Sequence, residues 1–568
     1  MVRWLGPRGL SATAMQVLLS TIFGAYSDKR DMQAALKQPA ESDFSAHESM
    51  WFDFLADTGD GFNPTYTTAT LVAGDIVLEH DGDELVTERG PLLLLGGDLA
   101  YPAATPTQFR ERFLGPMALA LPESATGDDP PVMIACAGNH DWYDGLTTFL
   151  RLFCEGKRIG GWQTEQTRSY FAIKLPQRWW ILGIDLAFDF FIDAPQMDFF
   201  RTVATEQLQP GDRVILVNHR PSWLFVGLGE HKLYTHQSTA NMQEFERTIL
   251  HANGIEVPLV LAGDIHHYNR YVSAEGDQQR ITAGAGGTFL HPTDYLRTEF
   301  SWPTGDGATT FQQEHVYPGI ARSKRMRWGT LLAPFKNPSF VVFLGAFYLL
   351  FMLAVRFALP DANTVGLNTA LKDSDPDDVA QAIFNNPLSF LLAVGLLGVL
   401  ITFADASTNV RRILAGLGHW VLQFLLLVLV IWGVAELATE LPDERLVIES
   451  FFLKFTLTLD TLVLIVGVAL IGGYLASQLF AIYLFLAYSL FRRHATHAFS
   501  SQRIEDYRCF LRFRIDADGS LTIYPIGVRK VPKRWRFVLD DGPHRAEPRD
   551  RAIEAHLIEP PIRISGGD

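Results

Sequence analysis

The sequence predicts an α/β domain, followed by an all-α transmembrane bundle of four spans and a small β-rich tail. Three observations support this order. Five short apolar runs before residue 300 each end in a small turn and then in a carboxylate, amide or imidazole side chain. Four long apolar stretches lie between residues 339 and 491. The final region alternates apolar and polar side chains, as strands with one exposed face do.

A chain of 568 residues is too long for one ordinary domain. We expect a helical lead-in over residues 1–45; the alternative is a signal peptide, but no clear cleavage site follows the short apolar stretch. The net charge of −15 argues against a nucleic-acid-binding protein, which would need a basic face. The three cysteines form neither a CxxC pair nor a disulfide framework, which agrees with a reducing compartment.

The five apolar runs are typical of buried strands, because they are short and are bounded by glycine or another small residue. The polar side chains that follow are Asp57 after "MWFDFLA", Asp98 and Tyr101 after "PLLLLGG", Asn139, His140 and Asp141 after "PVMIACAG", His219 after "RVILVN", and Asp264 and His266 after "VPLVLAG". The carboxyl ends of such strands converge, so we expect these side chains to meet. Carboxylates, imidazoles, an amide and a phenol suit hard or borderline divalent metals.

The order of these motifs, D-x-G, G-D-x-x-Y, G-N-H-D, H and G-x-x-H, resembles the calcineurin-like metallophosphoesterases over roughly residues 50–295. The combination of D-x-G with G-D-x-x-Y, together with "GDIHHYNR", is similar to the purple acid phosphatase branch. The resemblance implies a layered α/β/β/α sandwich, which we assign to residues 46–320. It also implies a dinuclear centre of two divalent or mixed-valence metal ions, with iron, manganese, magnesium and zinc as the candidates.

By this resemblance the first metal would be bound by Asp57, Asp98, Tyr101 and His266, and the second by Asp98, Asn139, His219 and Asp264. Asp98 would bridge the two ions. Tyr101 would supply the donor that many relatives take from a D-x-H histidine, since Gly59 stands at that position. Asp264 stands where the family usually has histidine; we expect it to favour Mn²⁺, Mg²⁺ or Fe²⁺ over Zn²⁺, the alternative being an impaired second site. Asp60 is interpreted as a turn residue.

The implied reaction is hydrolysis of a phosphate ester by in-line attack of a hydroxide that bridges the two metals. His140 is the candidate acid for the leaving group. Asp141 would orient His140, and it also fits a helix N-cap. Arg220 fits either a phosphate contact or a surface salt bridge. The competing hypothesis is a membrane signalling or scaffold protein that retains the fold but is catalytically impaired, which Asp264 favours.

The four apolar stretches, at about residues 339–359, 387–404, 413–435 and 461–491, are long enough to cross a bilayer; the alternative is a buried helical domain. The last stretch fits either one tilted helix or a hairpin bent at Gly472-Gly473. One crossing puts every basic cluster on one side, including the juxtamembrane linker at 321–338, as the positive-inside rule requires. We therefore expect an integral membrane protein of a bacterial inner membrane, with a cytoplasmic domain and tail and outer loops at 360–386 and 436–450.

A membrane anchor suggests a substrate at the membrane surface. Two apolar segments near the motifs, residues 146–162 and 220–234, fit either core packing or a lip that admits an acyl or isoprenyl chain, in which case the phosphate would be lipid-linked. The basic segment "ARSKRMRW" would then follow the anionic lipid surface. The tail at 492–568 contains a predicted hairpin over 507–531, whose "DADGS" turn lacks the features of an EF-hand calcium loop.

Overall fold

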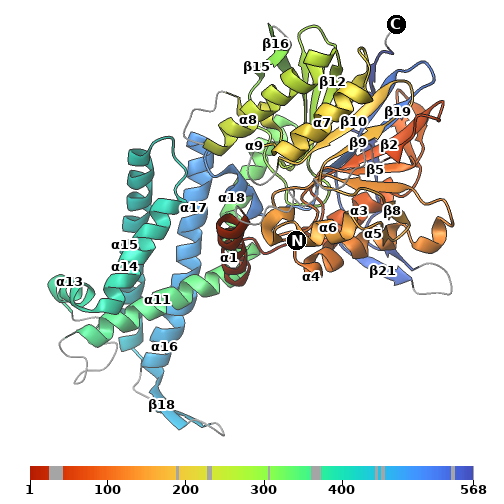
Figure 1. Ribbon diagram of the computed structural model, residues 1–568. Coiled ribbons are helices and arrows are strands. Elements are labelled where there is room, and N and C mark those ends of the chain that lie inside the picture. The colour runs from red at the N-terminus through yellow and green to blue at the C-terminus, as the bar shows by residue number, and fades with distance from the viewer. Residues whose placement is uncertain are drawn as a thin grey trace. The chain divides into compact units, whose positions relative to one another are not determined.

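The computed structural model describes residues 1–24, 42–186, 191–226, 233–304, 307–359, 371, 374–441, 445–449, 454–538 and 544–566. The chain forms two compact units, each with its own hydrophobic core (Figure 1). The first unit consists of Met1–Val2, Ser11–Arg325 and Arg503–Asp568, and the second consists of Arg3–Leu10 and Met326–Gln502. The expected N-terminal helix is α1 (Pro7–Gly24), while residues 25–41 of the lead-in lie outside the described residues.

Two nine-stranded sheets form the centre of the first unit. The order of sheet A is β1-β9-β10-β11-β12-β14-β13-β16-β15, with β1 (Ser42–Asp43), β9 (Phe171–Lys174), β10 (Trp179–Ile184), β11 (Arg213–Asn218), β12 (Glu256–Ala262), β13 (Tyr268–Ser273), β14 (Gln279–Ala283), β15 (Glu299–Thr304) and β16 (Gly307–Tyr317). The order of sheet B is β23-β20-β19-β2-β5-β6-β8-β7, with β24 beside β20; its strands are β2 (Met50–Leu55), β5 (Leu92–Leu95), β6 (Val132–Ala135), β7 (Arg158–Ile159), β8 (Trp162–Thr164), β19 (Arg508–Ile515), β20 (Leu521–Val528), β23 (Ala555–Leu557) and β24 (Ile562–Ile564).

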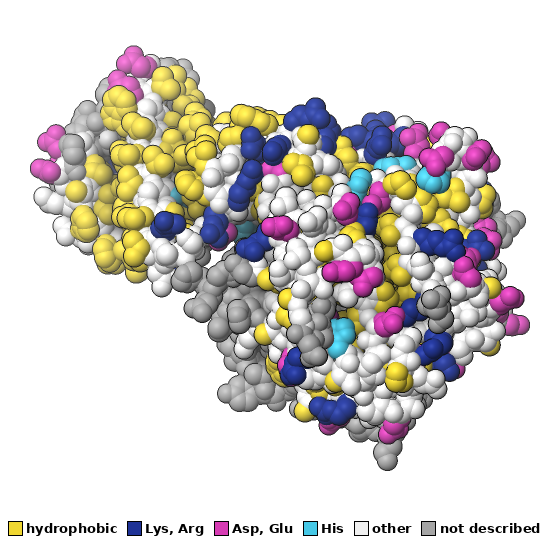
Figure 2. Space-filling view, turned by 90° about the horizontal axis from the view of Figure 1, so that it is seen from above, with side chains coloured by type: hydrophobic (Ala, Val, Ile, Leu, Met, Phe, Trp, Pro, Cys, Tyr) yellow, Lys and Arg dark blue, Asp and Glu magenta, His cyan; other side chains and the backbone are white. Residues whose placement is uncertain are grey.

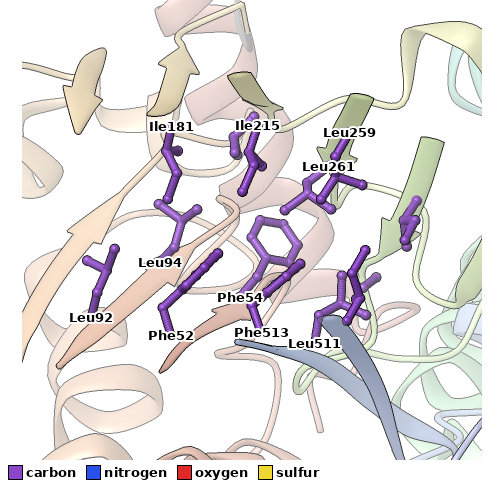
Figure 3. Close-up of a cluster of buried hydrophobic side chains, with 14 of the residues drawn as sticks. Phe52, Phe54, Leu92, Leu94, Ile181, Ile215, Leu259, Leu261, Leu511 and Phe513 are labelled. Carbon is purple, nitrogen blue, oxygen red and sulfur yellow. The ribbon is translucent and has the colours of Figure 1, made fainter. Parts of the chain in front are cut away.

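The two sheets pack face to face through apolar side chains (Figure 3). Phe52 and Phe54 of β2 lie in this core with Ile215 of β11, and the ring of Phe52 stacks on Phe513 of β19 with centroids 4.5 Å apart. The opposite faces are covered by helices: α3 (Phe62–Val72), α5 (Gly115–Ala120) and α6 (Thr147–Phe153) on sheet B, and α7 (Ala194–Glu206) and α8 (Leu233–Phe245) on sheet A. The predicted α/β/β/α layering is therefore confirmed.

The strands at the centre of each sheet run parallel. In sheet B these are β2, β5 and β6, and in sheet A they are β10, β11 and β12. The loops after β2, β5, β6, β11 and β12 carry the polar side chains that the sequence singles out. Because the carboxyl ends of parallel strands meet at one edge, this topology gathers those side chains in one place.

The β-rich tail belongs to sheet B of the first unit. Strand β19 pairs antiparallel with β2, and β20 pairs antiparallel with β19. Tail residue Glu559 accepts hydrogen bonds from Tyr268 Oη and Arg270 Nη2 of β13, at 2.5 and 2.6 Å. The tail was expected as a separate region after the spans, whereas its strands from Arg508 onward cover a side of β2 that would otherwise be an open sheet edge. An alternating pattern reveals a strand but not its partner.

A buried ion pair fixes the tail against β2. Arg512 Nε and Nη2 donate to Asp53 Oδ1 and Oδ2 at 2.7 and 3.0 Å, and both side chains are at most 2 % exposed. The guanidinium also donates to the backbone carbonyls of Leu71, Gly74 and Thr87. A bidentate contact of this kind fixes the register of β19 against β2. The loss of either partner would leave the other charge buried and unpaired.

The second unit is a bundle of long apolar helices. Three described helices are long and apolar enough to cross a membrane: α11 (Pro338–Ala358), α15 (Asn409–Thr439) and the helix Leu459–Phe491. A further pair, α13 (Pro376–Asn385) and α14 (Pro387–Phe403), is bent by 89° and makes a fourth candidate if it counts as one span. The last helix runs unbroken through α16 (Leu459–Gly467), one π-helical turn (Val468–Gly472) and α17 (Gly473–Phe491), which favours one helix over the hairpin.

The surface of this bundle is apolar, and its polar groups are turned inward. Hydrophobic side chains cover the face of the helical unit in Figure 2, and the exposed ones include Val342, Leu391, Val399, Leu414, Leu429 and Leu470. Inside, Tyr348 Oη donates to Gln423 Oε1 at 2.9 Å, and Gln423 Nε2 lies 3.3 Å from His419 Nε2. Such a distribution suits a lipid surround, in which polar groups need partners within the protein.

The remaining elements are short. The expected juxtamembrane linker is helical, with α9 (Ile320–Met326), a 3₁₀ turn (Arg327–Leu332) and α10 (Ala333–Lys336). The others are α4 (Pro106–Phe109), α18 (Ala495–Ser500), and the hairpins β3 (Ile76–His80) with β4 (Asp83–Thr87), β17 (Arg445–Glu449) with β18 (Lys454–Thr458), and β21 (Trp535–Val538) with β22 (Arg545–Pro548).

Arg512→Met should lower the free energy of unfolding of the first unit by about 3–5 kcal/mol, because Asp53 would stay buried without its partner. Denaturant unfolding of the detergent-solubilised protein, followed by tryptophan fluorescence, measures this value. The double variant Asp53→Leu/Arg512→Met should recover most of the loss, since it buries no charge.

Arg514→Met is the matched control on the same strand. Arg514 pairs with Asp516 at 2.8 Å but is 44 % exposed, so its loss should cost less than about 1 kcal/mol. Equal effects of the two single variants would contradict a structural role for the Arg512–Asp53 pair.

Candidate active site

Three aspartates at strand ends adopt a left-handed backbone conformation. Asp57, Asp98 and Asp264 have φ angles of 55°, 53° and 62°, in a region that side-chain-bearing residues rarely adopt. They follow the last residues of β2, β5 and β12 by two or three positions. The amide of Asp264 donates to Asp57 Oδ2 at 2.9 Å, so the turns are tied to one another. Strain of this kind persists only where the surroundings hold it, and it concentrates at functional sites.

Two glycines let the backbone approach these carboxylates. A Cβ at Gly138 would lie 2.1 Å from Asp98 Oδ1, and one at Gly263 would lie 2.4 Å from Asp57 Oδ2. Both distances are far below van der Waals contact, so no other residue fits at either position without a shift of the site. The glycines that precede Asn139 and Asp264 are therefore part of the construction of the site.

Asp57, Asp98 and His219 are the one group of carboxylates and imidazoles among the described residues whose ligand atoms all lie within 4.8 Å of one another. All three are buried. His219 Nδ1 donates to the carbonyl of Gly96 at 2.8 Å, which leaves Nε2 as the atom that faces Asp98, 3.5 Å from its Oδ2. Among the described residues Nε2 has no hydrogen-bond partner. A buried imidazole nitrogen turned toward carboxylates, with its other nitrogen fixed on a carbonyl, fits a metal ligand.

The electrostatics of the group favour a cation. Burial, together with the charges of Asp98 and Asp264, raises the pKa of Asp57 well above its usual value, against the attraction of His219. Burial also opposes ionisation of Asp98, but His219 and His140 outweigh it and lower the pKa of Asp98 to about 2. Burial opposes protonation of His219, yet the surrounding carboxylates raise its pKa. Three carboxylates against one imidazole leave a net negative charge, which suits a metal ion.

Tyr101 lies between the carboxylates. Its Oη is 3.0 Å from both Asp57 Oδ1 and Asp98 Oδ2, and 3.3 Å from His266 Nε2. Burial and the two carboxylate charges raise the pKa of Tyr101 well above its usual value, so the phenol donates to them. Gly59 makes this position accessible, because Tyr101 N donates to its carbonyl at 3.1 Å and a Cβ there would lie 2.1 Å from a facing backbone oxygen. The exchange of a donor between positions 59 and 101 stays a prediction, and the phenol of Tyr101 lies beside both carboxylates.

Two other predicted metal ligands lie beside this group. His266 Nε2 is 3.7 Å from Asp57 Oδ1, and Asp264 Oδ1 is 3.9 Å from His219 Nε2. Asn139 lies on the loop after β6, and its amide nitrogen donates to the hydroxyl of a neighbouring tyrosine, Tyr143, at 3.1 Å. The side-chain carbonyl oxygen of Asn139 is then the atom that could bind a metal ion.

His140 is oriented by a backbone carbonyl. Its Nδ1 lies 2.8 Å from the oxygen of Pro102, which can only accept, so Nδ1 carries a proton. The imidazole packs against Tyr101 with ring centroids 4.4 Å apart, and its backbone amide donates to Asp98 Oδ1 at 2.8 Å. His140 is half-buried, with Nε2 as its second exchangeable position.

The structure does not support the expected role of Asp141 as the group that orients His140, nor a side-chain N-cap. The carboxylate of Asp141 is buried and accepts hydrogen bonds from three backbone amides: Asp98 at 2.9 Å, Leu99 at 3.1 Å and Gly138 at 2.9 Å. It therefore joins the loop after β5 to the loop after β6. A side chain that bonds amides of a distant loop cannot be recognised from local sequence.

Two further buried residues support the site: His291, which the sequence analysis did not predict, and Asp60, which it did. The ring of His291 stacks on His266 with centroids 4.0 Å apart, and its Nδ1 accepts from the amide of His266 at 3.2 Å. His291 lies in the segment "AGAGGTFLHPT", residues 283–293, which also resembles the calcineurin-like metallophosphoesterases and is the signal that points to it. Asp60 is a buried turn residue, as expected, and accepts from the amides of Val2 and Phe289 at 2.7 and 3.0 Å.

The two apolar segments after the motifs are mainly core. Leu146, Phe149, Phe153 and Trp162 lie in the core on the outer face of sheet B, and Trp223 lies in the core on the outer face of sheet A, with Leu224 and Val226 packed against it. Phe225 is half-buried. Residues 227–232 of the second segment lie outside the described residues. Core packing is thus the better interpretation of most of both segments.

The comparisons with known proteins bear on this site directly. Residues 50–268 match the family model of the calcineurin-like phosphoesterases. These residues include all nine predicted site residues and run from β2 to the first residue of β13, without the apolar helices or the tail. A search of curated proteins returned no match. Residues 50–268 are therefore similar to a calcineurin-like phosphoesterase domain, and their strand-end side chains include a group that could hold a metal ion.

Asp98→Ala should remove bound metal from the purified protein, because Asp98 contributes to the closest group of ligand atoms and has a place in both predicted ligand sets. Metal content per chain, determined by mass spectrometry after gel filtration, measures the loss. Asp198→Ala is the control, since Asp198 is exposed on α7. A folded Asp98→Ala protein that keeps two metal ions per chain would contradict this description of the site.

Proposed function

We propose that the first unit hydrolyses a phosphate ester with the aid of two divalent or mixed-valence metal ions, and that the helical unit anchors it in a membrane. The observation that carries the proposal is the buried Asp57–Asp98–His219 group, at the carboxyl ends of parallel strands within residues that match the phosphoesterase family. Convergent ligands in that position are typical of a catalytic centre.

The proposed ligand sets are Asp57, Asp98, Tyr101 and His266 for one ion, and Asp98, Asn139, His219 and Asp264 for the other. The bound ions would activate water and neutralise negative charge on the phosphate. The position of Tyr101 between Asp57 and Asp98 supports the further proposal that the domain is nearest to the purple acid phosphatase branch. Hard carboxylate oxygens among the ligands agree with Mn²⁺, Mg²⁺ or iron.

His140 is proposed as the acid that protonates the leaving oxygen of the substrate. With Nδ1–H bonded to the carbonyl of Pro102, the proton that can be exchanged is at Nε2. Asp141 would act on catalysis only indirectly, because it joins the loops that carry Asp98 and His140.

His140→Ala should keep the bound metal and slow hydrolysis of an aryl phosphate by about 10²–10⁴-fold, which is the usual contribution of a general acid. Turnover is measured with Mn²⁺, Mg²⁺, iron and Zn²⁺ in turn, on the full chain in detergent. Loss of metal from this variant would make His140 a ligand instead. A folded, metal-loaded wild-type protein without turnover would favour the competing function, an impaired signalling or scaffold protein.

We propose further that the phosphate ester is carried on a lipid. The support is that the phosphoesterase domain is covalently continuous with helices long and apolar enough to enter a bilayer. Most of the two apolar segments packs in the core. Among the described aromatic side chains of the second segment, Phe225 is the one that is still partly exposed. Comparing turnover of an aryl phosphate with that of a long-chain lipid phosphate in the same micelles tests this choice, and preference for the aryl phosphate would contradict it.

The topology proposed is four crossings with both flanking regions in the cytoplasm. The pairing of β19 with β2 supports an even number, because residues before and after the helical unit belong to one folded unit. Three candidate helices would leave the tail on the opposite side, so the bent pair α13–α14 is needed as the fourth crossing. The basic segments at 321–338, 409–412 and 492–494 support the cytoplasmic side.

Single cysteines introduced into a Cys154→Ser background should report this topology, since Cys136 and Cys509 are buried. An impermeant thiol reagent added to intact cells should modify Asp375→Cys, in the loop before α13, and should spare Asp518→Cys in the exposed turn of the tail. Lysed cells, in which both positions react, are the control. Modification of position 518 in intact cells would overturn the cytoplasmic assignment.

A further inference from the structure

Arg220 lies directly beside the metal-type ligands. It follows His219 at the end of β11, and its amide donates to Asn218 Oδ1 at 2.6 Å, which fixes the turn. Its guanidinium lies between a carboxylate and an aromatic ring: Nε is 3.8 Å from Asp264 Oδ2, and Cζ is 4.7 Å from the ring centroid of Phe225. The side chain is thus held on two sides at the level of the site.

Arg220 and Asp264 form the rim of the site. Their side chains are 21 % and 23 % exposed, whereas those of His219 and Asp98 are each 2 % exposed. A substrate that approaches the buried group from this side would meet these two side chains first. A bound phosphate would keep its outer oxygens at the rim while its phosphorus atom faces the buried ligands.

A cationic side chain at the rim would assist such a substrate. The proposed metal ions would offset the buried carboxylates, whereas Asp264 lies at the rim, where a phosphate monoester brings up to two negative charges. The guanidinium of Arg220 offsets the charge of Asp264 within ion-pair distance, and its planar fork of donors matches the oxygens of a phosphate.

We propose that Arg220 binds the phosphate group of the substrate, and that Asp264 and the ring of Phe225 position its guanidinium for this contact. The inference rests on the proposed phosphoesterase function and names the residue that recognises the substrate's phosphate. In this arrangement Asp264 has two partners, His219 on the inner side and Arg220 on the outer side.

The test uses the full chain in detergent, loaded with Mn²⁺, and inorganic phosphate as the probe. Arg220→Met keeps an unbranched apolar stem but removes the guanidinium and its charge. It should raise the Kd of inorganic phosphate by about 10- to 100-fold, the range for a hydrogen bond to a charged group. The Kd of Arg220→Lys should lie between those of the wild type and Arg220→Met, because lysine keeps the charge but lacks the planar fork of donors. The KM for an aryl phosphate should rise in Arg220→Met by more than kcat falls, with metal content unchanged.

Arg178→Met is the matched control. Arg178 also pairs with an aspartate, Asp212 at 2.8 Å, but this pair precedes β10 and β11 and so lies at the amino ends of the strands. The Arg178→Met variant should bind inorganic phosphate with the same Kd as the wild type. An unchanged Kd in a folded, metal-loaded Arg220→Met protein would overturn the proposal, and so would loss of metal from that variant.

The two proposals can fail separately. A wild-type protein that binds phosphate through Arg220 but hydrolyses no ester would support the role of Arg220 and contradict the proposed hydrolysis. Hydrolysis with a KM and a phosphate Kd that Arg220→Met does not change would support the proposed function and contradict the role of Arg220.

Discussion

The pairing of β19 with β2 makes the first unit depend on both halves of the chain. Strand β2 lies between β5 and β19, contributes Phe52 and Phe54 to the core, and leads directly to Asp57. The tail reaches the loops behind the site as well, because Cys509 N donates to the carbonyl of Ala285 at 3.2 Å, and the buried Arg508 donates to the carbonyl of a nearby threonine. The backbone that supports the site is therefore built from residues far apart in the sequence.

The geometry of the site is set mainly by backbone hydrogen bonds. The amides of Gly287 and Thr288 donate to the carbonyl of Asp57 at 2.7 and 3.1 Å, and Asp141 holds the loops after β5 and β6 together. These contacts hold aspartates in left-handed conformations that a free loop would leave. These backbone contacts therefore hold the carboxylates close together.

The features that the sequence predicted correctly are those carried by local patterns. Each strand end with its turn and ligand-type residue is a segment of about ten residues, and parallel strands bring such ends to one edge by topology alone. The prediction that Tyr101 replaces a donor missing at Gly59 stays a prediction; the structure has Tyr101 N bonded to the carbonyl of Gly59.

The features that were missed depend on distant partners. Asp141 bonds a loop more than forty residues away, and its sequence position beside His140 suggested a different role. The partner of the tail hairpin lies at the other end of the chain. The apolar segment at 387–404 gave no sign of the 89° bend that precedes it, because hydropathy records length and not direction.

The connection between β2 and β19 also bears on how the protein is made. Arg512 and Asp53 are 459 residues apart, so a ribosome adding 5–20 residues per second needs about 25 to 90 seconds between them. During that time the apolar helices leave the ribosome, while β2 has no partner on one side and Asp53 has no counter-charge. Sheet B is therefore completed only after the whole helical unit has been synthesised. A nascent chain that stalls within the helices cannot form the complete sheet B, so the strand that leads to Asp57 would lack the neighbour that covers its edge.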